Sequence, residues 1–295
     1  MESVPYDKRS GKIWFNGQTV DWKEANIHIL NHGLHYASCV FEGERVYDGE
    51  IFRLKEHTER LFYSAKRMGI KVPYTQNEIN EACKYIVNIQ KVNNGYVRPL
   101  IWRGSEMMAI SAQKNKVHVA IATWEWGSYF DPKLKIEGIK LNISKWRRPA
   151  PNTIPWDTKA AGLYMICTLS KHEAEEQGFT DSLMLDFEGN IAEATGANIF
   201  FKSKDGQLHT PIPDSFLDGI TRRAVIEIAK SKNIKVIERK ILPDEMKNFE
   251  GCFLTGTAAE ITPVSKIDKF DFKVCELIKD LSVSYQNIVR KKSAA

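Results

Sequence analysis

The stretch EATGANIFFKSKDGQLHTPIPDSFLDGITR, residues 193–222, carries most of the information about the architecture of this chain. Glu193 stands beside a turn of small residues, and the apolar run that follows predicts a strand. Asp205-Gly206 predicts a turn into a second strand, and a proline-rich loop comes next. Gly219 then opens an amphipathic helix, whose unpaired N–H groups and positive dipole end favour an anion such as phosphate.

The spacing within this stretch resembles the signature of the class IV, fold-type IV pyridoxal-phosphate aminotransferases. Other segments resemble the branched-chain amino acid aminotransferases in particular, and together they cover nearly the whole chain. The signature is matched by Glu193, Thr195, Asn198, Ile199, Phe200, Leu208, Thr210, Leu217, Gly219, Ile220 and Arg222. The other segments are FNG at 15–17, YASCVFEGERVY at 36–47, YVRPL at 96–100, APNTIP at 150–155, K-x-x-G-x-Y at 159–164 and GTAAEITPV at 256–264.

The resemblance implies an α+β, two-domain fold of the D-amino acid aminotransferase type. We expect a small N-terminal domain at 1–125, an interdomain loop at 126–136, and a large cofactor-binding domain with a barrel-like sheet at 137–295. Local patterns predict further elements. Asn16-Gly17 and Asp48-Gly49 predict hairpins, the second with strands at 40–47 and 51–54; residues 117–124 predict a strand buried on both faces, and 234–241 an alternating strand.

Composition excludes several classes of function. The 295 residues are 43% hydrophobic, enough for one or two globular domains, and no apolar run is long enough to span a membrane. The net charge of +5 is spread along the chain, so nucleic-acid binding is not expected. Five widely spaced cysteines without a C-x-x-C pair indicate reduced thiols and a cytoplasmic protein. His28, His32 and His35 have no thiolate or carboxylate to complete a metal site.

The cofactor implied by the resemblance is pyridoxal 5′-phosphate, with Lys159 as its Schiff-base lysine. A lysine in a partly desolvated, electropositive pocket has a lowered pKa, so it can serve as both anchor and base. Glu193 would pair with the pyridine nitrogen and Tyr164 with the phenolic oxygen. The phosphate would be held by Arg60, Thr257 and the N–H groups of Ile220 and Thr221. The full cofactor set is Arg60, Lys159, Tyr164, Glu193, Gly196, Ala197, Asn198, Leu217, Gly219, Ile220, Thr221, Gly256 and Thr257.

The substrate side is also implied by the resemblance. The α-carboxylate would be held by Tyr96 and the turn at Thr257 and Ala258. An apolar pocket would be walled by aromatic residues, with further residues from a partner subunit, and Arg98 would accept the distal carboxylate of glutamate. The pocket residues are Phe41, Trp126 and Tyr129, joined by Tyr36 and Ile110 from the partner. Three positions differ from the family's usual residues: Leu163, Glu44 and Ala37.

These observations predict a branched-chain amino acid aminotransferase that acts on L-leucine, L-isoleucine or L-valine and passes the amino group to 2-oxoglutarate. The same fold would also serve a D-amino acid aminotransferase or an aminodeoxychorismate lyase, and a non-catalytic phosphate-binding protein would use the helix start alone. Arg98, Trp126 and the turn at 256–264 favour the branched-chain enzyme. We expect a homodimer at least, up to a hexamer, with small-molecule substrates only.

Overall fold

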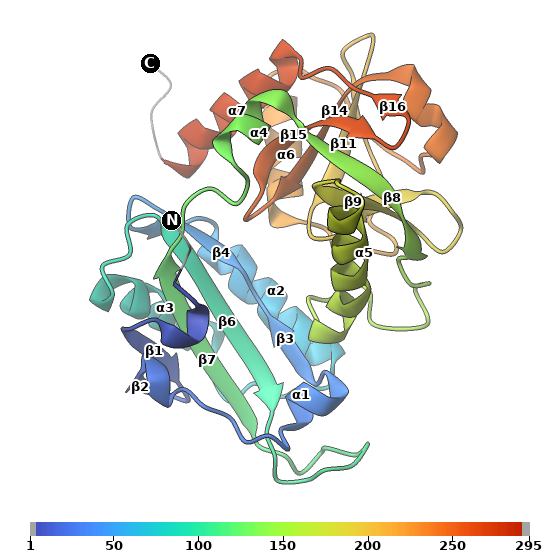
Figure 1. Ribbon diagram of the computed structural model, residues 1–295. Helices are drawn as coiled ribbons and strands as arrows, with labels where there is room; N and C mark the ends of the chain where they lie inside the picture. Colours follow the sequence, from blue (N-terminus) through green and yellow to red (C-terminus); the bar gives the residue numbers. More distant parts are fainter. Residues whose placement is uncertain (1–3, 291–295) are drawn as a thin grey trace. The chain divides into compact units, whose positions relative to one another are not determined.

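The structure is a computed structural model that describes residues 4–290 (Figure 1). Contacts between Cα atoms divide the chain into two compact units. The first comprises residues up to Gly127 together with Thr158–Gly162, and the second comprises Ser128–Asp157 together with residues from Leu163 onward. The domain boundaries expected from the sequence stay a prediction. Within residues 4–290, no helix is long and apolar enough to cross a bilayer.

The first unit contains a seven-stranded antiparallel sheet and the helices that pack on it. The strands are β1 (Lys12–Phe15), β2 (Gln18–Asp21), β3 (Cys39–Phe41), β4 (Glu44–Tyr47), β5 (Glu50–Ile51), β6 (Gly95–Arg103) and β7 (Val117–Glu125). Their order is β2-β1-β7-β6-β4-β5, and β3 pairs with β6. The helices are α1 (His32–Tyr36), α2 (Leu54–Arg67) and α3 (Gln76–Ile89), with short 3₁₀ segments at Tyr6–Lys8 and Trp22–Glu24.

Both expected hairpins in the first unit are present. Asn16 and Gly17 have φ angles of 50° and 86°, and Asp48 and Gly49 have φ angles of 51° and 83°, as a type I′ turn requires. The second hairpin is shorter than predicted: its return strand is only Glu50–Ile51, and Leu54 already begins α2. The strand ends at Ile51 because Phe52 and Arg53 form a turn, with Arg53 at a φ of 53°.

The prediction that the strand at 117–124 is buried on both faces is wrong, because only one face of β7 is fully buried. Val119, Ile121 and Thr123 are at most 1% exposed, whereas the side chains between them are partly exposed. Helix α3 packs against β1, β6 and β7, which explains the buried face. The apolar run therefore reflects a strand in an antiparallel sheet with one covered face.

The second unit is built on a closed sheet, of which Figure 1 labels β8, β9, β11, β14 and β15. Six strands pair in a ring, in the order β10-β9-β8-β15-β14-β11 and back to β10, which confirms the expected barrel-like sheet. Strand β8 is parallel to β9 and β15, and the other pairs in the ring are antiparallel. The ring strands are β8 (Ile139–Arg147), β9 (Asp181–Leu185), β10 (Ile191–Ala194), β11 (Asn198–Ser203), β14 (Phe249–Gly256) and β15 (Glu260–Ile267).

Shorter strands and helices surround this ring. The remaining strands are β12 (Leu208–Thr210), β13 (Val236–Glu238) and β16 (Phe270–Asp271). The alternating strand expected at 234–241 is thus reduced to β13, which pairs in parallel with β12. The helices are α4 (Pro132–Glu137), α5 (Met165–Glu176), α6 (Ile220–Ser231) and α7 (Glu276–Val289), with 3₁₀ segments at Ala161–Tyr164 and Pro243–Asn248. Helix α5 packs on β8 and β9, and α6 packs on β14 and α7.

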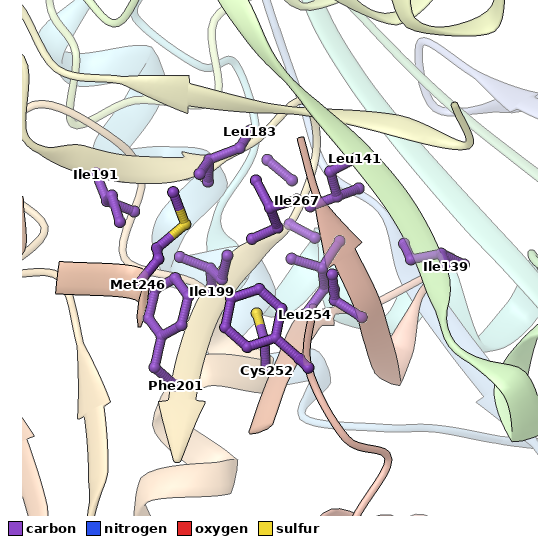
Figure 2. Close-up of a cluster of buried hydrophobic side chains, with 14 of the residues drawn as sticks. Ile139, Leu141, Leu183, Ile191, Ile199, Phe201, Met246, Cys252, Leu254 and Ile267 are labelled. Carbon is purple, nitrogen blue, oxygen red and sulfur yellow. The ribbon is translucent and has the colours of Figure 1, made fainter. Parts of the chain in front are cut away.

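A cluster of buried apolar side chains fills the ring and includes residues from all six of its strands (Figure 2). Alternate residues face inward on most strands, as with Ile199 and Phe201 on β11. Strand β10 is different, because its pairing register with β9 shifts between Ile191 and Glu193. Ile191 and Ala194 join the cluster, three residues apart, and Glu193 does not.

Candidate functional site

Lys159 lies on a short extended segment that is attached to the first unit by backbone contacts. The Phe41 N–H donates to the Lys159 carbonyl at 3.1 Å, and Val40 forms an isolated antiparallel bridge with Ala160. On the other side, the Lys159 N–H donates to Ser64 Oγ of α2 at 3.0 Å. The backbone of Lys159 is therefore held between the edge of β3 and helix α2.

The amine of Lys159 lies in partly desolvated and cationic surroundings. Its Nζ is 5.0 Å from the centre of the Phe41 ring. Burial lowers the pKa of the Lys159 ammonium below its ordinary value, nearby Arg60 lowers it further, and Glu42 acts in the opposite direction. A lysine in such surroundings gives up its proton more readily and can act as a nucleophile.

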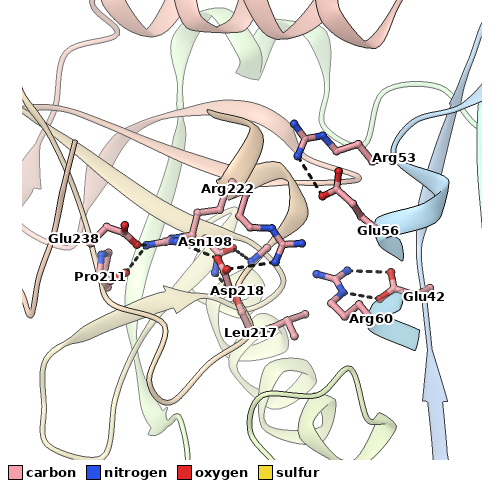
Figure 3. Close-up of polar contacts among 12 residues, drawn as sticks. Glu42, Arg53, Glu56, Arg60, Asn198, Pro211, Leu217, Asp218, Arg222 and Glu238 are labelled. Carbon is pink, nitrogen blue, oxygen red and sulfur yellow. Dashed lines mark hydrogen bonds and ion pairs between the residues drawn. The ribbon is translucent and has the colours of Figure 1, made fainter. Parts of the chain in front are cut away.

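Helix α2 presents His57, Arg60 and Ser64 on one face, since residues three, four and seven apart lie on the same side of a helix. Arg60 donates from Nε to Glu42 Oε1 at 2.7 Å and from Nη2 to Glu42 Oε2 at 2.9 Å (Figure 3). His57 Nδ1 is 2.6 Å from Glu42 Oε2. The sequence indicated Arg60 but missed Glu42, although Glu42 lies in a segment that resembles the family.

An aromatic and cationic group adjoins Lys159. The Arg98 guanidinium lies 4.7 Å from the Phe41 ring centre and 5.4 Å from that of Tyr96. Tyr96 also meets Trp126 edge to face, with ring centres 4.8 Å apart. Arg98 Nε is buried and has no hydrogen-bond partner among the described residues. The structure thus brings Phe41, Tyr96, Arg98 and Trp126 together, and it offers a buried donor that suits a carboxylate.

Arg45 is a further residue of this group that the sequence reasoning missed. It is 6% exposed, and its Nη1 donates to the Gly127 carbonyl at 2.9 Å. The guanidinium lies 5.5 Å from the Tyr47 ring centre and 6.0 Å from that of Trp126. Arg45 lies in the segment YASCVFEGERVY at 36–47, which could have indicated it. Its side chain ties β4 to the loop that carries Trp126.

Tyr36 and Ile110, which the resemblance assigns to the pocket of a partner subunit, lie on the surface of the first unit. Tyr36 is 42% exposed at the end of α1, and Ile110 is 84% exposed in the loop before β7. The two segments are in contact, because His32 Nε2 is 2.9 Å from the Ala109 carbonyl oxygen.

In the second unit, Glu193 is a buried carboxylate with a cationic neighbour. It is 8% exposed and pairs with Asn198 across β10 and β11. Asn198 Nδ2 donates to Glu193 Oε2 at 3.1 Å, and Arg148 Nε is 3.4 Å from Oε1, an ion pair without hydrogen-bond geometry. Arg148 was missed from the sequence. It directly follows β8, and its Nη1 donates to Cys167 Sγ in α5 at 3.5 Å.

Asn198 also fixes the start of α6. Its Nδ2 donates to the Leu217 carbonyl at 3.0 Å, and the Gly219 N–H donates to its Oδ1 at 3.0 Å. A Cβ at Gly219 would lie only 2.2 Å from that oxygen, so this position requires glycine. Helix α6 begins at Ile220 and has no acidic residue in its first turn. Its first N–H groups, including that of Thr221, lack intrahelical partners and suit an anion.

Two turns of small residues pack against each other in the second unit. A Cβ at Gly256 would lie 3.3 Å from Ala197 Cβ and 3.4 Å from the Gly196 carbonyl oxygen. Thr257 and Ala258 continue the same turn and are partly exposed. A side chain at position 256 would therefore press on Ala197 and the Gly196 carbonyl, whereas a Cβ at Gly196 would meet nothing within 4 Å.

The remaining expected residues of the second unit are also placed. Tyr164 precedes α5 and is partly exposed, as is Leu217. Tyr129 is 45% exposed, and its ring lies edge to face with Phe130. Arg222, the last residue of the signature, is structural: it is 2% exposed and donates to Asp218, Glu238 and the Pro211 carbonyl (Figure 3). It braces the loop before α6 against β13.

Comparison with known proteins bears on this arrangement. The sequence pattern of the family described as "Amino-transferase class IV" matches residues 39–267. The "Probable branched-chain-amino-acid aminotransferase" of Rickettsia felis is 42% identical over 295 residues, which cover 99% of this chain and 100% of the relative. The "Branched-chain-amino-acid aminotransferase" of Pseudomonas aeruginosa is 41% identical over 264 residues. The match covers 88% of this chain and 86% of the relative.

Solved structures agree with the sequence relatives. The branched-chain aminotransferase of the archaeon Thermoproteus uzoniensis superposes with a TM-score of 0.92 at 34% identity, covering 97% of each chain. The Escherichia coli enzyme gives a TM-score of 0.93 at 35% identity and covers 96% of each chain. The expected fold-type IV architecture is confirmed. This chain belongs to amino-transferase class IV and, within it, to the branched-chain amino acid aminotransferases.

Proposed function

We propose that this protein transfers the amino group of L-leucine, L-isoleucine or L-valine to 2-oxoglutarate with pyridoxal 5′-phosphate as cofactor. The products are a branched-chain 2-oxo acid and L-glutamate, released in turn by a ping-pong reaction. The observation that carries the proposal is the partly desolvated Lys159 amine, held beside Arg60 and Arg98. Relatives support the cofactor, since solved branched-chain amino acid aminotransferases at 35–36% identity contain pyridoxamine 5′-phosphate and N-(5′-phosphopyridoxyl)-L-glutamate.

The residues of the first unit fit this cofactor. Lys159 would hold its aldehyde carbon covalently and, once released as the amine, would move the proton at the substrate's α-carbon. Its lowered pKa supports both roles, because the neutral amine is the reactive form. Arg60 would bind the phosphate. The bound cofactor supplies an electron sink for the bonds at that carbon.

The residues of the second unit fit it as well. Glu193 would pair with the pyridine nitrogen, and Arg148 Nε lies 3.4 Å from this buried carboxylate. The first N–H groups of α6, at Ile220 and Thr221, would bind phosphate together with Thr257. Gly219 allows the Asn198 side chain to hold the start of this helix, because a Cβ there would lie 2.2 Å from Asn198 Oδ1. Tyr164 would donate to the phenolic oxygen.

The substrate pocket would use the aromatic group around Arg98. Phe41, Tyr96 and Trp126 offer apolar ring faces to an aliphatic side chain. Arg98 Nε, without a hydrogen-bond partner among the described residues, would receive the distal carboxylate of 2-oxoglutarate or glutamate. Tyr129 and the turn at Thr257 and Ala258 would be the remaining residues that contact the substrate. One pocket could then hold either type of side chain.

A homodimer is the smallest assembly that we propose. The segments around α1 and before β7 expose an apolar surface of the first unit, and His32 links them. A second copy would cover this surface, and Tyr36 and Ile110 would then reach the partner's pocket. Exposed apolar residues are Ile27, Ile29, Leu30, Leu34, Met107, Met108 and Ile110. Assembly up to a hexamer and a cytoplasmic location stay predictions.

The visible absorption of the purified protein tests the function. We expect bound pyridoxal phosphate to give a band that changes on adding L-leucine and returns with 2-oxoglutarate. A band that responds only to D-alanine would favour a D-amino acid aminotransferase on the same fold. No band after incubation with pyridoxal phosphate would overturn the proposal. Light scattering of wild type and Leu34→Arg tests the dimer, because the variant should shift toward monomers.

A further inference from the structure

Glu42 is a fully buried carboxylate in the first unit, and the function proposed above gives it no role. It is 0% exposed and lies between β3 and β4. Its oxygens accept hydrogen bonds from Arg60 Nε and Nη2, from His57 Nδ1 at 2.6 Å, and from the Gly43 N–H at 3.2 Å. Burial by itself raises the pKa of Glu42, but Arg60 and His57 outweigh burial and hold it well below its ordinary value. The side chain is therefore ionised.

The two bonds to Arg60 are a bidentate pair, at 2.7 Å and 2.9 Å (Figure 3). A carboxylate that meets two nitrogens of a guanidinium fixes both the plane and the rotation of that group. Arg60 has a long side chain, only 11% exposed, that would otherwise occupy several rotamers. Glu42 itself is held by His57, one turn earlier on the same helix face.

The charge of Glu42 acts on two cations at once. It neutralises Arg60 directly, and it opposes the effects of burial and of Arg60 on Lys159. The backbone of Lys159 is tied to Ser64, one turn after Arg60 on α2, and to Phe41, next to Glu42 in the chain. Glu42, Arg60 and Lys159 thus form one connected arrangement.

We propose that Glu42 is a positioning residue for the cofactor's phosphate, acting by locking the guanidinium of Arg60 in the orientation that receives it. This inference rests on the proposed role of Arg60. It requires that loss of Glu42 weakens binding of a phosphorylated cofactor much more than binding of the same molecule without its phosphate.

Glu44 provides a matched control. It lies two residues further along the same chain segment, is also 0% exposed, and shares the buried surroundings. Neither of its oxygens has a hydrogen-bond partner among the described residues. Glu44→Gln therefore changes a buried carboxyl of the same size without removing a bond to Arg60.

The test measures dissociation constants of pyridoxal phosphate and of pyridoxal for the full-length protein by absorption titration. We expect Glu42→Gln to raise the dissociation constant of pyridoxal phosphate about tenfold to a hundredfold, the range for loss of a charge-assisted hydrogen bond. The dissociation constant of pyridoxal should rise less than about twofold. Glu44→Gln should leave the ratio of the two constants unchanged. In an Arg60→Met background, Glu42→Gln should have no further effect, because the two residues act as a unit.

Equal weakening of both ligands by Glu42→Gln, or an undiminished effect in the Arg60→Met background, would overturn the proposal. If Glu42→Gln does not fold, Glu42→Asp replaces it, since aspartate keeps the charge but is one methylene too short to keep both bonds to the Arg60 guanidinium. Weaker binding of pyridoxal phosphate than of pyridoxal, relative to the wild type, supports the positioning role. An unchanged ratio of the two dissociation constants overturns it. If Arg60→Met itself leaves the ratio unchanged, the proposed role of Arg60 fails, and if the wild type binds neither ligand, the proposed function fails.

Discussion

Replacing Glu44 with methionine is expected to stabilise the protein at neutral pH. Glu44 is fully buried in the first unit, and neither carboxyl oxygen has a hydrogen-bond partner among the described residues. Burial raises the pKa of Glu44 well above its ordinary value, the Glu42 charge raises it further, and Arg60 only partly opposes them. Methionine is unbranched, has a similar length and carries no charge, so it can occupy the same space.

The magnitude follows from the cost of keeping this carboxyl protonated. An ordinary glutamate has a pKa of about 4.3, so holding it neutral at pH 7 costs at most about 3.7 kcal/mol, at about 1.4 kcal/mol per pH unit. Two unsatisfied oxygens add to this, since an unsatisfied buried polar group costs about 1–3 kcal/mol. We therefore expect Glu44→Met to gain about 2–4 kcal/mol in the free energy of unfolding at pH 7.

The pH dependence identifies the cause. The folded state binds the Glu44 proton more tightly than the unfolded state, so this group lowers wild-type stability as pH rises from about 4 toward its folded-state pKa. Below that window the folded and unfolded states are both protonated, and the pH-dependent penalty disappears. The gain from Glu44→Met should thus be smallest near pH 4 and should grow toward pH 7.

Urea unfolding of the wild type, Glu44→Met and Glu44→Gln between pH 4 and pH 7 measures this effect. Glutamine is neutral throughout, so the two variants should differ by an amount that does not depend on pH. A gain from Glu44→Met that is equal at pH 4 and pH 7 would refute the reasoning, because it would mean that the carboxyl titrates normally in the folded protein.

Three further predictions concern the site. Lys159→Ala should abolish steady turnover of L-leucine with 2-oxoglutarate while the circular dichroism spectrum stays unchanged; turnover at the wild-type rate would contradict the role of Lys159. Gly219→Ala should weaken pyridoxal phosphate binding and cost about 1–3 kcal/mol in the free energy of unfolding, because its Cβ would lie 2.2 Å from Asn198 Oδ1. Gly219 has a φ of −69°, so this cost contains no backbone strain; Gly127→Ala, with nothing within 4 Å of its Cβ and no positive φ, is the control and should cost much less. Arg98→Met should raise KM for 2-oxoglutarate at least about tenfold and that for L-leucine less than about threefold, as measured by steady-state kinetics; equal changes for both substrates would argue against a carboxylate contact.

Local patterns predicted most individual elements. The Asn-Gly and Asp-Gly pairs predicted the hairpins at 16–17 and 48–49, because type I′ turns demand positive φ at two consecutive residues. Helices α2, α3 and α7 each bury one face of apolar residues at helical spacing, a pattern that is local in the sequence. The errors were local as well. The strands predicted at 51–54 and 234–241 are longer than the observed strands β5 and β13.

The family came from the spacing of the stretch at 193–222 and from the other quoted segments, and the role expected of Lys159 came from the resemblance to that family. The six-stranded ring was expected only through that resemblance, because no local pattern reveals that β10 pairs with β11 to close it. The partners of the charged residues were not readable either. Arg148 beside Glu193, and Arg60 and His57 beside Glu42, are separated by many residues along the chain.

The sequence by itself therefore determined most local elements and the family, and through the family it indicated most charged residues of the site, although Glu42, Arg45 and Arg148 were missed. Only the tertiary structure decided their charge states. Glu42 and Glu44 are two residues apart and equally buried, yet one has a lowered pKa and the other a raised pKa. The physical reason is that desolvation and ion pairing depend on which distant side chains meet a group in space, and only folding brings Arg60 and His57 to Glu42.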